Sequence, residues 1–114
     1  AVPSEDGKLG RMSIDKSFEG ELEGTSVGEM LSALTDTKGS AGYVAMEKVT
    51  GKLGGKAGTF VLQHSGTMER GKQALVVTVV PDSGTGELTG LTGRLGIRIE
   101  GGKHFYEMEY EIGA

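Results

Sequence analysis

Two histidines stand where a strand pattern could turn them toward the interior. His64 lies in phase with Phe60, and His104 lies in phase with Tyr106. Because residues two apart on a strand share a face, each imidazole is predicted on the side of these aromatic rings. Histidine ionises near neutral pH, so an inward imidazole could act as a general acid or base or hydrogen-bond a ligand. The commoner outcome is a structural histidine with satisfied hydrogen bonds.

Glu47 is a third residue that could transfer protons. Tyr43 and Glu47 share one face of their segment, and Val44 and Met46 share the other. If Tyr43 points inward, Glu47 does too, and it then needs a partner such as a tyrosine hydroxyl, a histidine or an arginine. Charged side chains are rarely fully buried, which slightly favours the opposite orientation, with Val44 and Met46 inside and Glu47 in solvent.

The candidate site residues fall into two groups. The candidates for catalysis are Glu47, His64 and His104. The candidates for ligand binding are Tyr43, Phe60, Gln63, His64, His104 and Tyr106. Gln63 is out of phase with His64, so whether its side chain points inward or into solvent is as undecided as it is for Glu47.

A row of carboxylates near the end of the chain resembles a cation site. Glu107, Glu109 and Glu111 alternate along one strand face. Neighbours on such a face are about 7 Å apart and repel one another unless basic residues face them. A solvated face opposite Arg94 and Arg98 is the favoured interpretation, and we expect no metal site and no cofactor.

These residues lie on segments that read as strands separated by glycine-rich turns. The expected strands cover residues 12–22, 28–34, 41–50, 59–68, 72–80, 95–99 and 104–112. Segment 28–34 could instead form one helical turn, and the strand is the preferred interpretation. We expect a turn at Gly24-Thr25, a hairpin joining 41–50 to 59–68, and a second hairpin at the end of the chain. Segment 72–80 has β-branched residues on both faces, which predicts the most buried strand, covered on both sides.

Seven or eight such strands with no long helical period predict an all-β antiparallel sandwich or barrel. Closure into a barrel removes exposed sheet edges, and the 21 glycines could supply its bends, so a barrel is favoured. We expect a single domain over residues 1–114, with a flexible terminus at 1–8.

Composition excludes several functional classes. With no cysteine among 114 residues, disulfides, thiolate metal sites and cysteine nucleophiles are excluded. The net charge of −4 argues against nucleic-acid partners, and no apolar run approaches the roughly 20 residues of a membrane span. We expect a cytoplasmic protein; the start at Ala1 leaves a processed terminus, a removed signal peptide or a shortened chain as alternatives.

Four segments closely resemble the small bacterial family known as domain of unknown function 3224. The segments are 39–45, 58–66 with its His-Ser-Gly ending, 79–88 with its Pro-Asp-Ser-Gly-Thr-Gly-Glu-Leu run, and 103–106. The similarity runs from about residue 8 to the end of the chain. The resemblance implies an eight-stranded antiparallel barrel of the allene-oxide-cyclase-like, calycin-like type and frequent self-association, but no known activity.

Family members usually carry a further strand ahead of 7–18, often with a tryptophan, and this sequence has no tryptophan. The barrel could therefore be one strand short, and an open edge would favour a homo-oligomer. The leading hypothesis is a barrel that binds a small apolar or aromatic ligand. The alternatives are a cofactor-free isomerase or cyclase acting in the lumen, by fold-level analogy alone, and a structural oligomeric domain with a packed core.

Overall fold

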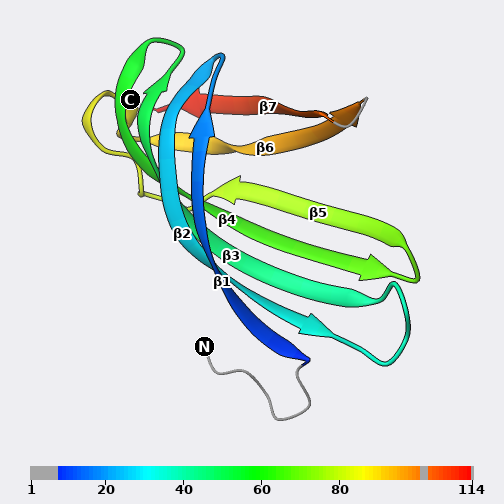
Figure 1. Cartoon of the computed structure of the whole chain (residues 1–114). Helices are drawn as coiled ribbons and strands as arrows, with labels where there is room; N and C mark the ends of the chain where they lie inside the picture. The colour runs from blue at the N-terminus through cyan, green and yellow to red at the C-terminus, as the bar shows by residue number, and fades with distance from the viewer. Residues whose placement is uncertain (1–7, 101–102, 114) are drawn as a thin grey trace.

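The protein is an antiparallel sheet whose strands are neighbours in chain order (Figure 1). The computed structural model describes residues 8–100 and 103–113, excluding the side chains of 97–100 and 103–105. The strands are β1 (Leu9–Phe18), β2 (Leu22–Leu34), β3 (Ala41–Leu53), β4 (Lys56–Glu69), β5 (Lys72–Val79), β6 (Leu91–Glu100) and β7 (Lys103–Ile112), and a short 3-10 helix, η1 (Gly86–Leu88), precedes β6. Within the described ranges, no helix is long and apolar enough to cross a membrane.

The all-β antiparallel prediction is confirmed, as are both hairpins. β3 pairs with β4 so that Tyr43 lies opposite Gly66, and β6 pairs with β7 so that Leu91 lies opposite Ile112. Strands β2, β3, β4, β6 and β7 extend beyond the predicted limits, whereas β1 ends at Phe18 and β5 at Val79, earlier than predicted. The alternation of polar and apolar residues therefore located the strands better than the positions of the glycines did.

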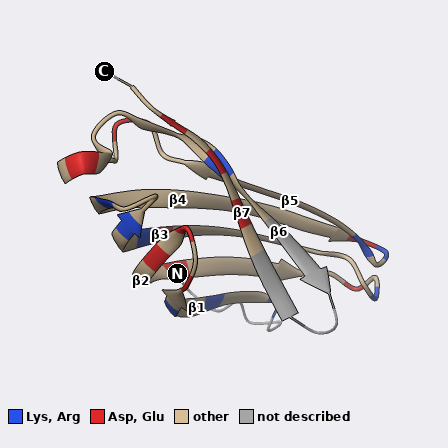
Figure 2. Ribbon diagram, turned by 90° about the horizontal axis from the view of Figure 1, so that it is seen from above, with Lys and Arg blue, Asp and Glu red and all other residues tan. Residues whose placement is uncertain are grey.

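The sheet curves strongly but does not close into the predicted eight-stranded barrel. Its seven strands end at β1 on one edge and β7 on the other, with no pairing between these two in the described residues. Figure 2 shows the β6–β7 hairpin crossing over the other strands. Phe18 and Tyr106 make the contact between β1 and β7, edge to face with ring centroids 5.4 Å apart. Side chains, rather than backbone hydrogen bonds, bridge the opening.

The predicted turn at Gly24-Thr25 is wrong, because the chain turns at residues 19–21 instead. Gly24 lies inside β2, paired with Phe18 on one side and Gly51 on the other. A Cβ at Gly24 would lie 2.2 Å from the carbonyl oxygen of Thr50. This glycine permits a close approach of two strands, which a sequence cannot distinguish from a turn signal.

The prediction that segment 72–80 is the most buried strand is also wrong. Val77 and Val79 are buried, but Val76 points to the other face and is 58% exposed. The seven strands form one layer, so their outer face has no second layer to cover it. β-branched residues on both faces therefore do not indicate burial on both faces here.

The concave face is packed at one end and hollow at the other. At the packed end, Val49 and Leu53 of β3 meet Phe60 and Leu62 of β4, and Leu88 of η1 covers them. Further along both strands toward β3's start and β4's end, the face opens into a cavity. Residues 47 and 64 lie between these two regions.

β5 and β6 are joined weakly. In the described residues they share a single register pair, Thr78 with Arg94. After β5 the chain continues beside β4, where the Val80 N–H donates to the Val61 carbonyl at 2.9 Å. The β6–β7 hairpin thus has few backbone bonds to the rest of the sheet.

Candidate functional site

Glu47 points inward and is fully buried, with 0% of its surface exposed. Val44 and Met46, on the opposite face of β3, are 51% and 52% exposed. The slightly favoured orientation, with Glu47 in solvent, is therefore wrong. The uncovered outer face leaves those two apolar side chains in water, and the concave face supplies the partners that a buried carboxylate needs.

Three side chains from three other strands meet the Glu47 carboxylate. His64 of β4 lies with Nε2 2.7 Å from Oε1, and the Ser26 hydroxyl of β2 donates to Oε2. Lys16 of β1 places Nζ 3.7 Å from Oε2. Each of these three side chains comes from an inward-facing position that is one inward-facing row of the sheet away from Glu47, as the strand registers show. The cluster therefore follows directly from strand pairing.

The Glu47 cluster keeps the carboxylate ionised. Burial alone raises the pKa of Glu47, but the hydrogen bonds from His64 and Ser26 and the charge of Lys16 outweigh it. The net result is a pKa below the ordinary value of 4.5. An ionised carboxylate accepts hydrogen bonds only, so His64 carries a proton on Nε2.

The other ring nitrogen of His64, Nδ1, belongs to a side chain that lines the cavity. Nδ1 has no hydrogen-bond partner among the described residues. Every buried side-chain nitrogen or oxygen atom of those residues does have a partner, so Nδ1 is not a buried atom. Nδ1 is therefore accessible, in agreement with the place of His64 in the cavity wall. With Nε2 protonated, a neutral His64 presents a lone pair on Nδ1 to any molecule in the cavity.

We expect the Glu47 carboxylate to contribute to the acid sensitivity of folding. The groups facing it are Ser26, Lys16 and His64, and its folded pKa lies below its unfolded value. Its stabilising contribution is complete above about pH 4.5 and is lost as the pH falls through the folded pKa. Urea unfolding between about pH 5 and about pH 3 should show a smaller loss of stability in Glu47→Gln than in the wild type. Equal losses in both proteins would contradict this assignment.

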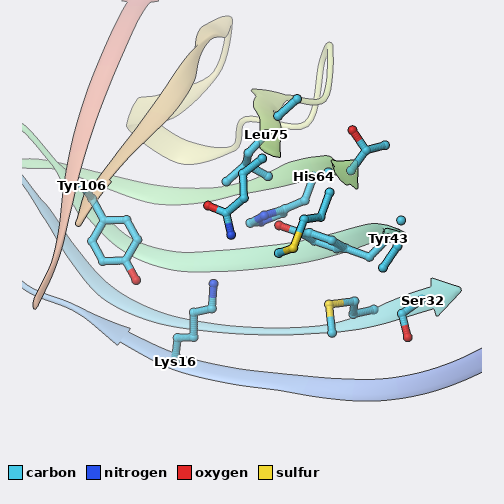
Figure 3. Close-up of a pocket in the computed structure, with 14 residues that line it drawn as sticks. Lys16, Ser32, Tyr43, His64, Leu75 and Tyr106 are labelled. Atoms are coloured by element: carbon cyan, nitrogen blue, oxygen red, sulfur yellow. The ribbon is translucent and has the colours of Figure 1, made fainter. Parts of the chain in front are cut away.

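The cavity has a volume of about 540 Å³ and is mainly apolar. Its walls come from β1–β5 on one side and β7 on the other, and include Lys16, Met30, Tyr43, His64, Leu75 and Tyr106. Figure 3 shows the amine of Lys16 and the hydroxyl of Tyr106 directed toward the space in front of His64. Two donors and one acceptor therefore face a common volume.

Tyr43 forms another part of this wall because its partner in β4 has no side chain. A Cβ on Gly66 would lie 2.4 Å from Cε1 of Tyr43, so the ring lies across the glycine. Burial raises the pKa of Tyr43, and the phenol remains a neutral hydrogen-bond donor or acceptor at physiological pH.

The structure brings together four of the sequence candidates and places two others elsewhere. Glu47, His64, Tyr43 and Tyr106 lie at or beneath the cavity. Phe60 instead lies in the packed core.

Gln63 does not join this site, and the His104 side chain lies outside the described residues. Gln63 lies exposed on the outer face, opposite Met46 in the register, because it is one residue out of phase with His64. In the register, His104 of β7 lies opposite Ile99.

Two residues of the site, Lys16 and Ser26, were not among the sequence candidates. Lys16 alternates with Ile14 and Phe18 on the apolar face of β1, and a cation on such a face was the available signal. Ser26 gave no signal, since a small polar residue is ordinary at any strand position.

The carboxylate row of β7 is an exposed face, as the favoured interpretation held. Glu107, Glu109 and Glu111 are all exposed, and Glu109 lies opposite Arg94 with Oε2 3.4 Å from Nη2. Among the described residues there is no group of three or more histidine or acidic side chains that could hold a metal ion.

Comparison with known proteins places the chain in a family. Residues 1–110 match the family described as Protein of unknown function (DUF3224). The crystal structure of a protein of unknown function from this family, from Shewanella oneidensis MR-1, is similar with a TM-score of 0.93 and 56% identity, over 99% of this chain and 85% of that chain. No curated protein matches the chain. The chain belongs to the DUF3224 family, which is described as being of unknown function, and its fold is shared by the Shewanella member.

Proposed function

We propose that the protein binds a small, largely apolar molecule in the concave cavity, with a polar group of that molecule directed at His64. The observation that supports this is the cavity itself, because about 540 Å³ lies within the roughly 300 to 1,000 Å³ typical of ligand sites. Apolar walls with a few convergent polar groups are the usual composition of such sites.

The polar groups define what the bound molecule must carry. His64 Nδ1 accepts a hydrogen bond, and the Lys16 amine and Tyr106 hydroxyl donate from the facing walls. Met30 and Leu75 supply apolar surface. A compact aromatic or alicyclic molecule with one oxygen function fits this pattern.

The alternative of a structural domain with a packed core agrees with only one end of the concave face. Phe60, Leu62 and their neighbours fill the end beneath η1, and the other end holds the cavity. Self-association stays a prediction, and so does kinship with the allene-oxide-cyclase-like, calycin-like folds, which the strong curvature of the open sheet supports.

Binding can be tested with 2-naphthol, whose fluorescence can be excited at wavelengths longer than those that tryptophan and tyrosine absorb. We expect saturable binding to the wild type and at least a tenfold weaker affinity in Met30→Trp, which fills the cavity. Met46→Trp is the matched control, because residue 46 is on the outer face. Absence of saturable binding to the wild type, or equal affinities in the two variants, would overturn the proposal.

A further inference from the structure

His64 is held in a way that a binding residue alone does not require. Its Nε2 is hydrogen-bonded to the buried Glu47 carboxylate, which also accepts a hydrogen bond from the Ser26 hydroxyl. Its Nδ1 has no partner among the described residues, and the side chain lines the cavity. A carboxylate on one imidazole nitrogen fixes the tautomer and stabilises the imidazolium that forms when the other nitrogen takes up a proton. This is the arrangement of a general base.

A positive charge lies beside the Glu47–His64 pair. Lys16 Nζ lies 3.7 Å from Glu47 Oε2 and is directed to the space in front of His64 (Figure 3). An ammonium in a partly buried, mainly apolar site stabilises negative charge that develops on an oxygen beside it. The cavity therefore pairs a proton acceptor with a group that stabilises an oxyanion.

We propose that the protein catalyses proton transfer at the carbon next to the carbonyl group of a bound apolar ketone, with His64 as the base and Lys16 as the donor to the carbonyl oxygen. This inference rests on the proposed binding function and names its substrate class. Glu47 acts as a positioning residue, because it touches His64 and not the bound molecule.

The reaction is balanced without an oxidant or reductant. The Nδ1 lone pair takes a proton from the α-carbon, so a C–H bond breaks and an N–H bond forms. The electron pair of the broken bond moves onto the carbonyl oxygen, which becomes an enolate hydrogen-bonded to Lys16. The imidazolium then returns the proton to the same carbon, or to a conjugated carbon, in which case the double bond has shifted.

A bicyclic ketone, 2-tetralone, is the probe for this step. In D2O, exchange at carbon 1 is followed by NMR, and ketone binding is measured on the same samples from the aromatic signals of the protein. We expect the wild type to exchange carbon 1 at least about 100-fold faster than His64→Gln, in line with general acid–base catalysis. Gln retains an N–H for Glu47, so this variant keeps the buried hydrogen bond.

Two further variants separate catalysis from structure. Glu47→Gln should bind the ketone with unchanged affinity but exchange it at least tenfold more slowly, a split that simple loss of folding would not produce. Ser65→Ala, on the exposed outer face next to His64, should behave as the wild type.

The outcomes distinguish the two proposals. Binding of 2-tetralone without accelerated exchange, or equal exchange by the wild type and His64→Gln, overturns the catalytic proposal and leaves binding in place. Binding of 2-naphthol but not of 2-tetralone overturns the ketone assignment alone. Binding of neither molecule overturns both proposals.

Discussion

His64→Leu is expected to lower the free energy of unfolding by about 3 to 5 kcal/mol, the usual cost of leaving a buried charge without its partner. The reason is that Glu47, with 0% exposure, loses the hydrogen bond to Oε1 and keeps only Ser26 and the more distant Lys16. Urea unfolding at neutral pH measures this loss directly, provided that the denaturant dependence is the same in both proteins.

The double variant Glu47→Met with His64→Leu identifies the cause. Replacing a buried polar pair by apolar residues of similar volume is often neutral, so we expect it to recover most of the lost stability, less the cost of leaving Ser26 without its acceptor. If the two substitutions add instead, or if His64→Leu alone costs under about 1 kcal/mol, the pair is not energetically coupled as described.

Phe60→Ala is expected to destabilise the protein by a similar amount, about 3 to 5 kcal/mol, for an unrelated reason. Phe60 is 1% exposed and packs at the closed end of the concave face, where its register partner Val49 is also fully buried. Truncation removes apolar contacts and leaves a void that the paired strands cannot readily collapse to fill.

Thermal or urea unfolding of Phe60→Ala should be compared with Val44→Ala. Val44 belongs to the neighbouring strand but is 51% exposed on the outer face, so its truncation should change stability by no more than about 0.5 kcal/mol. Comparable losses in the two variants would mean that the outer face is covered by a partner. Comparable 2-naphthol affinities of wild type and folded Phe60→Ala would separate the core from the cavity.

Alternation within single strands was the most reliable guide to this fold. The pattern that placed Tyr43 with Glu47, and Phe60 with His64, gave the correct sets of residues on each face of β3 and β4. It did not give which face was buried, because that depends on what lies against the sheet. Because charged side chains are rarely buried, the sequence favoured the solvent face for Glu47, which is the wrong face.

The contacts between strands were beyond the reach of the sequence. His64 meets Glu47 because of the β3–β4 register, and Lys16 reaches the same carboxylate across β2. One shift in register would have flipped every side chain of a strand to the other face. Pairing is a property of two segments together, and neither segment alone encodes it visibly.

The junction between β5 and β6 lies between the two walls of the cavity. His64 belongs to the five-stranded part of the sheet, and Tyr106 belongs to the hairpin beyond the junction. In the described residues one register pair joins β5 to β6, and Val77 and Val79 of β5 share one hydrophobic core with Leu95 of β6. The separation of the two walls is therefore set by the packing of core side chains and not by a ladder of backbone hydrogen bonds.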